Sequence, residues 1–467
     1  MLPVIALVGR PNVGKSTLFN RLTVSNDAIV ADVPGVTRDR QYGYGRLGSR
    51  ACVIVDTGGL VDKPVGIETE MRIQTERAIA EADVLVLVTD ARSGLTHQDQ
   101  ACAQLLRRSG KPVLLAVNKA EGADRDMAAA DFQVLALGKP YAVSATHGSG
   151  CKDLLELALE AAPPREAEEA ESDQQAIRVA VIGRPNVGKS TLVNRLIGDE
   201  RVIASDVPGT TRDSIFVPFE RDGRRFVLID TAGVRRRSKV DDMIEKASVA
   251  RTLQAIDAAH VVIMVLDAHD TVAEQDASVL GLALQEGRAL LIAINKWDNI
   301  PMEQRDDIRR QLDLRLDFVP YAPQFFISAR HGSGVGDLVV ASIRAYEAAM
   351  REMPTPKLTK TLERAMEQHQ PPLVRGRRIK LRYAHQGGRN PPRIIIHGSQ
   401  AASVPEAYKR YLANVYREQY ELYATPVQVE FRSDTNPYSR KSLMPGGKPK
   451  RWTQSEKRGE QRGGKRK

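Results

Sequence analysis

Two copies of one glycine-rich segment stand in the sequence, GRPNVGKSTLFNRL at 9–22 and GRPNVGKSTLVNRL at 183–196. Glycine lets a backbone come close enough to a phosphate group for successive N–H groups to bind it. In such a loop the ammonium groups of Lys15 and Lys189 reach the β- and γ-phosphates of a nucleotide. A plain turn before a helix would explain one copy, but the two copies lie 174 residues apart in a fixed register. The residues expected around the phosphates are Gly9, Arg10, Pro11, Asn12, Val13, Gly14 and Lys15, and Gly183, Arg184, Pro185, Asn186, Val187, Gly188 and Lys189.

Oxygen-bearing side chains near each loop form a candidate Mg²⁺ site. Ser16 and Ser190 follow the loop lysines, where a hydroxyl ligates the metal. Asp56 and Asp230 each end an apolar run, and a carboxylate at a strand tip can hold Mg²⁺ through water. Both pairs keep the offset of 174 residues, which supports one metal site beside each loop.

Two further threonines complete the predicted metal ligands. Thr37 and Thr211 lie in the polar segments DVPGVTRDR at 32–40 and DVPGTTRDS at 206–214. One such segment is typical of an ordinary Pro-Gly turn. Two such segments, again 174 residues apart, favour mobile loops whose threonine binds Mg²⁺ and the γ-phosphate.

The segments after the two aspartates are predicted to sense the γ-phosphate. In DTGGL and DTAGV a glycine N–H can bind that phosphate, and its loss would release the loop as a switch. The next position is Leu60 or Val234, where some GTPases place a Gln that orients the attacking water. We therefore expect slow intrinsic hydrolysis, or assistance from elsewhere. The residues concerned are Asp56, Thr57, Gly58, Gly59 and Leu60, and Asp230, Thr231, Ala232, Gly233 and Val234.

A second pair of motifs predicts which base is bound. In Asn-Lys-x-Asp the carboxylate accepts hydrogen bonds from the guanine N1–H and 2-amino group, and adenine offers no such pair of donors. NKWD is complete, whereas NKAE carries Glu121 in place of Asp, which leaves guanine selectivity at the first site open. The predicted base-binding residues are Asn118, Lys119, Ala120 and Glu121, and Asn295, Lys296, Trp297 and Asp298, with Ser328 and Ala329 near the guanine O6. His147 and His331, in the HGSG segments that follow, are expected to be structural.

Apolar runs alternating with helical segments must position these residues. In the first copy we expect strands at 4–8, 51–55, 84–88, 112–117 and near 141–143, and helices at 15–22, 68–80, 98–108 and 152–161. This order indicates an α/β fold with a mainly parallel sheet covered on both faces, and ligands at the carboxyl ends of the strands. Residues 177–350 repeat the pattern, so the expected units are GTPase domains at 1–161 and 177–350, joined by a flexible acidic linker at 162–176.

The chain after 350 changes character. A helix at 359–369, strands at 378–383 and 393–397, a helix at 406–423 and a strand at 426–431 indicate a small α+β domain over 355–440. Residues 441–467 are expected to be a disordered basic tail, since 443–467 holds nine Lys or Arg against two Glu. The tail is expected to attract RNA phosphate; a tail that only aids solubility is the alternative. The basic loop VRRRSKV at 234–240 also has two possible interpretations: it senses rRNA phosphate, or it is a solvent-exposed basic loop without a partner.

These motifs resemble the bacterial double-Era-like GTPase family, called EngA or Der. The resemblance covers nearly the whole chain, and tandem GTPase domains in one polypeptide are highly specific to that family. It implies a biogenesis factor for the large ribosomal subunit, with rRNA as partner. It also implies a K⁺ ion near Asn12 and Asn186 that replaces a catalytic side chain, although loop capping would explain both residues.

The segment 355–440 resembles the KH-like domain that ends such proteins. It has no GxxG, the loop that clamps the RNA backbone in KH modules. RNA recognition by this domain is therefore in doubt, and Arg378, Arg382, Tyr383 and His385 could instead pack against a GTPase domain.

Composition narrows the class of protein. The 467 residues suggest about three domains, and the net charge of +10 suggests a polyanionic partner. No apolar run is long enough to span a bilayer, the N-terminal run fits a first strand better than a signal peptide, and three scattered cysteines are typical of buried thiols in a reducing compartment. We expect a cytoplasmic, monomeric GTPase that binds GTP or GDP and Mg²⁺; a P-loop kinase and a membrane-associated switch are the rival hypotheses.

Overall fold

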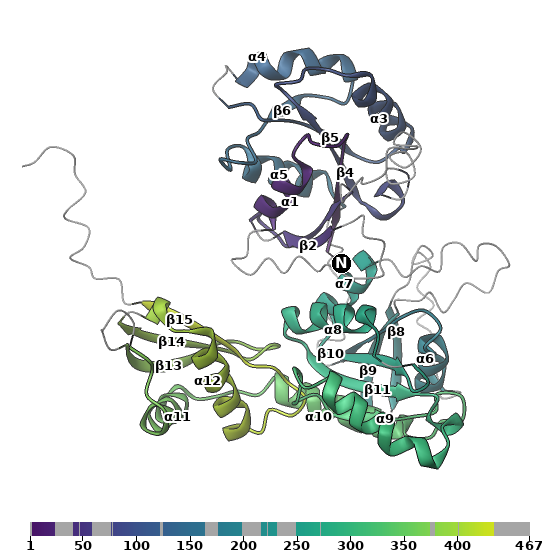
Figure 1. The fold of residues 1–467 in the computed structure, drawn as a ribbon, viewed down its shortest axis with the longest axis vertical. Coiled ribbons are helices and arrows are strands. Elements are labelled where there is room, and N and C mark those ends of the chain that lie inside the picture. Colours follow the sequence, from purple (N-terminus) through teal and green to yellow (C-terminus); the bar gives the residue numbers. More distant parts are fainter. Residues whose placement is uncertain are drawn as a thin grey trace, which may run out of the picture.

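The computed structural model describes residues 2–23, 41–45, 47–57, 76, 78–121, 125–163, 176–198, 216–221, 223–230, 249–270, 272–373, 379–399 and 401–433. Figure 1 shows three folded units in chain order, two built around a central sheet with helices and a smaller one at the carboxyl end. No helix in these ranges is both long enough and apolar enough to cross a bilayer.

The first unit is a six-stranded sheet in the order β2-β3-β1-β4-β5-β6. All neighbours are parallel except β2, which pairs antiparallel with β3 at one edge. The strands are β1 (Val4–Val8), β2 (Gln41–Gly45), β3 (Cys52–Asp56), β4 (Val84–Asp90), β5 (Val113–Asn118) and β6 (Pro140–Ala142). The helices are α1 (Lys15–Leu22), α3 (His97–Arg108), α4 (Arg125–Ala130) and α5 (Cys151–Ala161). The predicted parallel sheet is therefore confirmed.

The second unit repeats this sheet in the order β12-β11-β10-β7-β9-β8, again with one antiparallel edge strand, β8. Its strands are β7 (Ile177–Ile182), β8 (Phe216–Arg221), β9 (Arg224–Asp230), β10 (Val261–Asp267), β11 (Ala289–Asn295) and β12 (Gln324–Phe326). Its helices are α6 (Lys189–Ile197), α7 (Val249–Ala258), α8 (Glu274–Glu286), α9 (Met302–Arg315) and α10 (Val335–Ala349).

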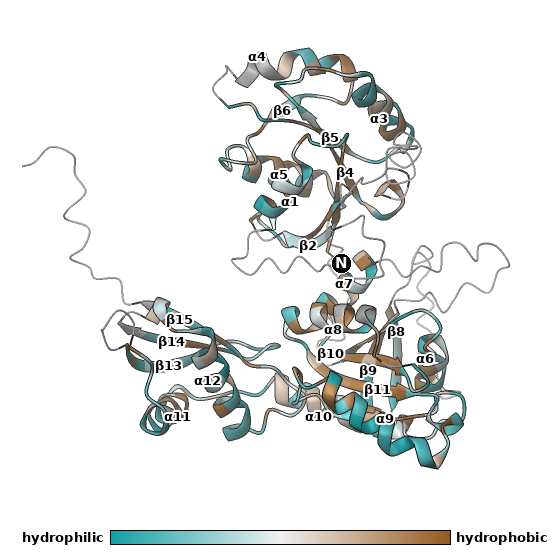
Figure 2. Cartoon of the chain, in the orientation of Figure 1, coloured by the Kyte–Doolittle hydropathy of each residue, from teal (hydrophilic) through white to brown (hydrophobic). Residues whose placement is uncertain are grey.

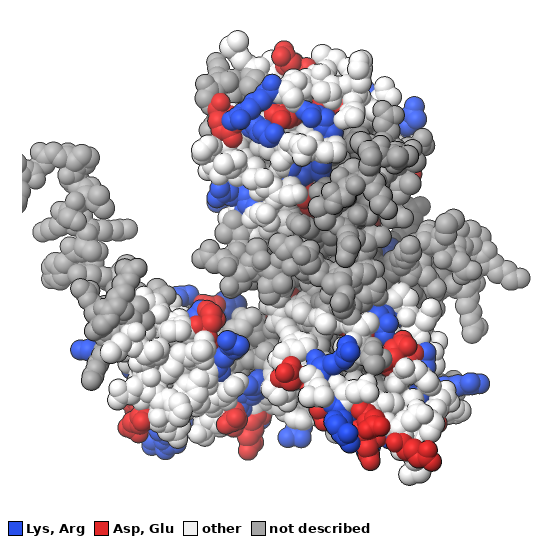
Figure 3. All heavy atoms as spheres, in the orientation of Figure 1, with Lys and Arg blue, Asp and Glu red and all other residues white. Residues whose placement is uncertain are grey.

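Burial explains why the central strands are continuously apolar. Every residue of β10 and β11 is buried, as expected for strands covered on both faces. Figure 2 shows these strands as hydrophobic and α9 as hydrophilic. Leu312 is the buried residue of α9, and Figure 3 shows acidic and basic side chains mixed over this helix. Helix α9 is thus a solvated outer element.

The third unit packs two helices against a three-stranded sheet in the order β13-β14-β15. Its elements are α11 (Thr355–Gln368), β13 (Lys380–Gly388), β14 (Arg393–Ser399), α12 (Glu406–Gln419) and β15 (Gln428–Ser433). Leu358, Ile396, Leu412 and Tyr416 belong to its core and are fully buried. The predicted α+β order is confirmed, although α11 begins at 355 and α12 ends at 419.

Two of the four residues that could pack against a GTPase domain stack with a ring of their own sheet instead. Among the described residues, the ring of Tyr383 stacks on His397 with centroids 4.5 Å apart, and His385 lies 5.2 Å from the same ring. Tyr383 is 42% exposed. Strands β13 and β14 thus bring Tyr383, His385 and His397 together on one face of their own sheet. Arg378 lies outside the described residues.

Backbone contacts join the second and third units. The N–H of Leu290 in β11 donates to the carbonyl of Ala424 at 2.8 Å, and the N–H of Asn390 donates to the carbonyl of Ala349 at 3.2 Å. The Arg288 guanidinium adds a bond of 2.9 Å to the carbonyl of Asn390. Strand β11, which ends in the predicted base-binding motif, is therefore hydrogen-bonded at its other end to the third unit.

Candidate functional site

The loop after β1 needs glycine at both of its ends. Gly9 and Gly14 have φ of 154° and 95°, and a Cβ would lie 2.3 Å from the carbonyl oxygen of Val88 and 2.4 Å from Nδ2 of Asn118, respectively. Gly14 also forms the N-terminus of α1. Such a helix start directs free N–H groups outward. The loop therefore has the glycine conformation and close packing that a phosphate cradle requires.

The second loop repeats this geometry. Gly188 has a φ of 98°, and a Cβ there would lie 2.2 Å from Nδ2 of Asn295. At Gly183 a Cβ would lie 2.4 Å from the carbonyl oxygen of Val265. The remaining loop residues fall alike in both copies except for the proline: Val13 and Val187 are buried, Arg10 and Arg184 are partly buried, and Asn12 and Asn186 are exposed, whereas Pro11 is partly buried and Pro185 is exposed.

Each loop folds over its lysine. Nζ of Lys15 donates to the carbonyls of Gly9 and Arg10, both at 2.9 Å. Nζ of Lys189 donates to the carbonyl of Arg184 at 2.6 Å. Burial lowers the pKa of Lys15, and the nearby Asp56 carboxylate acts in the opposite direction. A phosphate oxygen that replaced these carbonyls would restore a full negative partner to a buried ammonium group.

A hydroxyl and a carboxylate meet beside the first lysine. Oγ of Ser16 donates to Oδ2 of Asp56 at 2.7 Å, and Asp56 is buried at the end of β3. Hydroxyl, carboxylate and phosphate oxygens are the donors that Mg²⁺ prefers, so these residues fit the ion. In the second copy Ser190 is the second residue of α6 and Asp230 ends β9. The adjoining Thr57 turns its hydroxyl back to the carbonyl of Leu7, at 2.8 Å.

Asn118 and Asn295 tie the phosphate loop to the base loop. Nδ2 of Asn118 donates to the carbonyl of Val13 at 2.9 Å, and its Oδ1 accepts from the N–H of Ala145 at 3.0 Å. Asn295 does the same, with the carbonyl of Val187 at 2.8 Å and the N–H of Ala329 at 2.9 Å. The sequence analysis predicted that this amide contacts the base, and it did not predict that the amide links the phosphate loop to the base loop. One amide hydrogen remains for a base, since the group carries two.

Lys119 and Lys296, the lysines of the predicted base sites, are hydrogen-bonded to aspartates that the sequence analysis did not identify. Nζ of Lys119 donates to Oδ2 of Asp90 at 2.7 Å and to the carbonyl of Asn12 at 2.8 Å. Nζ of Lys296 donates to Oδ2 of Asp267 at 2.5 Å. Burial alone would raise the pKa of Asp90, but the hydrogen bonds from Lys119 and the Arg92 N–H, together with the positive charges of Lys119 and Arg10, outweigh it and the pKa is lowered. In both copies an aspartate ends the strand that precedes the one carrying the Asn-Lys motif, 29 residues before the lysine. This repeated spacing is the sequence signal that could have identified Asp90 and Asp267.

The acidic position is a Glu in the first base site and an Asp in the second, yet each is held by a serine. Glu121 accepts from Oγ of Ser144 at 2.8 Å and from Arg92 at 2.9 Å. Asp298 lies 3.4 Å from Nε2 of His331, and a hydrogen bond from Ser328 lowers the pKa of Asp298. Both carboxylates thus sit on the serine of the following loop and stay ionised.

The residues between Lys and the acid are supports. Ala120 and Trp297 are buried, and the Trp297 ring packs on Phe326 with centroids 4.4 Å apart. Sequence reasoning also missed the anchors of the loop arginines. Arg184 pairs with the buried Asp276 at 2.9 Å, and Arg10 lies 3.5 Å from the buried Asp99.

Several predicted site residues lie outside the described residues. They are Thr37, Gly58, Gly59 and Leu60 in the first copy, and Thr211, Thr231, Ala232, Gly233 and Val234 in the second, with the side chain of Asp230. The basic loop at 234–240, most of the acidic linker and residues 441–467 lie outside them as well.

Comparison with known proteins agrees with this geometry. A family model described as 50S ribosome-binding GTPase matches residues 4–119 and 178–296. A second, described as the KH-domain-like C-terminal domain of EngA bacterial GTPase enzymes, matches residues 352–432. GTPase Der of Thioalkalivibrio sulfidiphilus is 57% identical over 442 residues, covering 94% of this chain and 95% of its own. GTPase Der of Hahella chejuensis is 53% identical over 441 residues, covering 94% of this chain and 93% of its own.

The chain belongs to the GTPase Der family.

Membership of the Der family establishes the activity and the fold class. The chain is a GTP hydrolase with two tandem P-loop GTPase domains and a C-terminal KH-like domain. Der proteins bind guanine nucleotides, and GTPases of this kind typically use Mg²⁺. The P-loop kinase hypothesis is therefore wrong.

The geometry shows how a Der site can hold its substrate. Four strand ends of the first sheet, those of β1, β3, β4 and β5, carry the loop, Asp56, Asp90 and Asn118. They converge because parallel strands share one carboxyl edge. The buried amide of Asn118 then holds the phosphate loop and the base loop at a fixed distance from one another.

Proposed function

We propose that this GTPase is a nucleotide-gated assembly factor for the large ribosomal subunit, with rRNA as its partner. The observation that carries the proposal is the match of both GTPase domains to a family described as 50S ribosome-binding, on a chain that ends in a KH-like domain. The net charge of +10 supports a polyanionic partner. We also propose that the protein acts in the cytoplasm as a monomer, with domains at 1–161, 177–350 and 355–440.

At each site we propose in-line attack of water on the γ-phosphorus of GTP. The water oxygen forms the new P–O bond as the bond to the β-phosphate oxygen breaks, giving GDP and inorganic phosphate. Lys15 and Lys189 neutralise the charge that develops on the phosphate oxygens, and the loop N–H groups hold these oxygens in place. Mg²⁺, when bound to Ser16, Thr37 and Asp56 or their counterparts Ser190, Thr211 and Asp230, would supply further positive charge.

We propose in addition that K⁺ supports hydrolysis through Asn12 and Asn186. Both are exposed in the phosphate loop and adopt left-handed φ of 64° and 65°. Leu60 and Val234 stand where some GTPases have a Gln, and neither side chain can orient water. A cation beside the loop would instead stabilise the negative charge that develops on the phosphate oxygens. Hydrolysis rates in matched KCl, NaCl and choline chloride test this, and equal rates in all three salts would exclude a role for K⁺.

Co-sedimentation with purified large subunits tests the main proposal. Binding should be strongest with a non-hydrolysable GTP analogue and weaker with GDP or without nucleotide, at moderate salt. A Lys15→Ala/Lys189→Ala variant should lose the nucleotide dependence. Equal binding in every nucleotide state, lost at higher salt, would reduce the interaction to non-specific attraction of the basic chain to RNA.

A further inference from the structure

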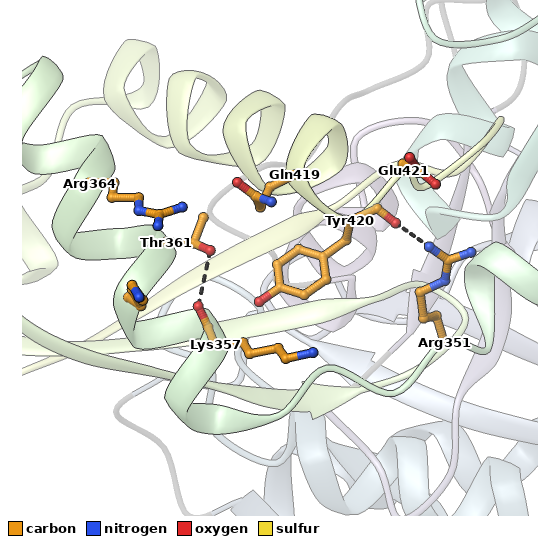
Figure 4. A pocket seen from close by; sticks show the side chains of 8 residues that line it. Arg351, Lys357, Thr361, Arg364, Gln419, Tyr420 and Glu421 are labelled. Carbon is orange, nitrogen blue, oxygen red and sulfur yellow. Dashed lines mark hydrogen bonds between the residues drawn. The ribbon is translucent and has the colours of Figure 1, made fainter.

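The KH-like domain contains a pocket of about 290 Å³ between α11 and the end of α12. Figure 4 shows the side chains around it, with Arg364 and Lys357 on α11 and Tyr420 just beyond α12. Four basic residues, Arg351, Lys357, Lys360 and Arg364, line it together with the single acidic residue Glu421. The lining therefore carries a positive excess.

The basic residues of α11 form a row. Lys357, Lys360 and Arg364 are spaced by three and four positions, which places them on one face of the helix. All three are exposed, and the structure gives none of them an ion pair with a described residue. The row extends about 10 Å along the helix axis, which is longer than a single phosphate and suits a chain of them.

Arg351 closes the pocket on the side of the second GTPase domain. Its Nη1 donates to the carbonyl of Tyr420 at 2.5 Å, as the dashed line in Figure 4 shows. This bond holds the turn after α12, so Arg351 both shapes the pocket and contributes charge to it.

The hydroxyl of Tyr420 is buried and makes no hydrogen bond of normal geometry to a described residue. The Thr361 hydroxyl interacts weakly with it, which opposes the effect of burial on the pKa of Tyr420, and itself donates to the carbonyl of Lys357 at 3.0 Å. Burial raises the pKa of Tyr420, so the phenol stays protonated at neutral pH. A buried donor without a hydrogen bond of normal geometry is costly, and an oxygen-rich ligand in the pocket would give it one.

We propose that this pocket binds backbone phosphates of RNA, with the α11 cations and the Tyr420 hydroxyl as donors. The proposal deepens the proposed function and rests on it for the identity of the RNA. It gives the KH-like domain, which has no GxxG, a phosphate contact on a different element. A free phosphate or a mononucleotide offers the same chemistry, and the experiment separates these sources.

The first test is a titration of a labelled single-stranded RNA with the full chain, followed by fluorescence anisotropy over a range of salt. The variant is Lys357→Gln/Lys360→Gln/Arg364→Gln. The matched control, Lys380→Gln/Lys409→Gln/Arg410→Gln, removes the same charge from the same domain outside the pocket. We expect the pocket variant to bind at least ~10-fold more weakly and its log K against log salt slope to fall by about 2. Equal losses in both variants would overturn the proposal.

A second variant removes only the hydroxyl of Tyr420. Tyr420→Phe should weaken RNA binding while the Tm stays unchanged or rises, because the hydroxyl makes no hydrogen bond of normal geometry to a described residue and only a weak interaction with Thr361 is lost. A lower Tm with unchanged RNA affinity would assign the hydroxyl to the fold and overturn its role as a donor.

Competition and sedimentation separate the remaining outcomes. Unlabelled RNA should displace the labelled strand far better than inorganic phosphate or GMP; displacement by GMP at comparable concentration would mean a mononucleotide site instead. With large subunits, the pocket variant should sediment less than the control variant while its GTP hydrolysis is retained. If the wild type itself fails to sediment, the ribosomal function fails while the RNA titration still decides the pocket.

Discussion

Nδ2 of Asn295 donates to the carbonyl oxygen of Val187 at 2.8 Å, and this bond passes directly beside Gly188. The base-binding motif and the phosphate loop of the second site are thereby one packed unit. The same bond joins Asn118 to Val13 in the first site, at 2.9 Å.

Gly188→Ala should therefore abolish nucleotide binding at the second site. The added Cβ would lie 2.2 Å from Nδ2 of Asn295, at a φ of 98°, and an alanine pays ~1–2 kcal/mol for a left-handed backbone before any clash. Calorimetric titration with GDP should show one bound nucleotide per chain in place of two. Two nucleotides with wild-type affinities would contradict the close packing.

Gly281→Ala is the matched control for that substitution. Gly281 lies inside α8, and a Cβ there would meet no atom within 4 Å. Alanine is favoured over glycine in a helix by about 1 kcal/mol. Nucleotide stoichiometry should be unchanged and the Tm equal or higher.

Asp298→Asn should shift the second site from guanine to xanthine. The carboxylate accepts from the two donors of guanine, whereas an amide presents a donor that suits the C2 carbonyl of xanthine. Loss of a charge-assisted pair costs ~1.5–3 kcal/mol, so GDP affinity should fall ~10- to 100-fold while XDP affinity rises. Competition between the two nucleotides measures this, and an unchanged preference would mean that Asp298 does not contact the base.

Glu121→Asp probes the corresponding position of the first site. Glu121 is held by Ser144 and Arg92, at 2.8 and 2.9 Å. The shorter side chain should release Arg92 and bring the carboxylate into the geometry of the second site. GDP should bind more tightly at the first site alone; a weaker affinity would show that the longer side chain is adapted to guanine there.

Asp56→Asn should raise the Mg²⁺ concentration needed for hydrolysis at the first site. The carboxylate lies 2.7 Å from the Ser16 hydroxyl, and an amide offers a weaker oxygen to a hard cation. Activity should be measured against Mg²⁺ in a Lys189→Ala background, so that only the first site turns over. An unchanged Mg²⁺ dependence would remove Asp56 from the metal site.

Acid should destabilise the junction of the second and third units. Burial, together with Arg178 and Arg288, lowers the pKa of His260 from 6.5 to about 4. The unfolded chain therefore takes up a proton that the folded chain does not, so stability is full above pH 6.5 and falls as the pH drops towards 4. The loss is at most about 3 kcal/mol. Urea unfolding at a series of pH values should show this slope.

The control for that slope is His260→Gln. Nδ1 of His260 accepts from the N–H of Arg178 at 3.1 Å, and the glutamine oxygen can take over this role without titrating. The variant should lose stability at neutral pH but show a flatter curve between pH 6.5 and 4. A wild-type slope in the variant would place the acid sensitivity elsewhere.

The sequence predicted the apolar, doubly covered strands well because burial on both faces leaves a continuous hydrophobic run, as in β4 and β10. It missed the edge strands β2 and β8, whose sequences QYGYG and FVPFER carry no such run. It also missed α9, which buries little and has no clear apolar face. Helix α11 began four residues earlier than expected, where Pro356 in the first turn is a start signal.

Within the site, the motif residues were predictable and their supports were not. Lysines, serines and the guanine motif follow from local spacing. Asp90, Asp267 and Asp276 act on residues 29 or 92 positions away in the chain, and only the parallel sheet brings those positions together. The Asn ties were missed for the same reason.

Strand β11 has a mechanical consequence for the molecule. At its start Leu290 is hydrogen-bonded to Ala424 of the KH-like domain, and it ends at Asn295. An extended strand is already close to the maximal length of its chain, so it forms an inextensible link between that domain and the amide that joins the phosphate loop to the predicted base loop of the second site. A pull on the docked carboxyl end would thus reach the second site through a single stiff element.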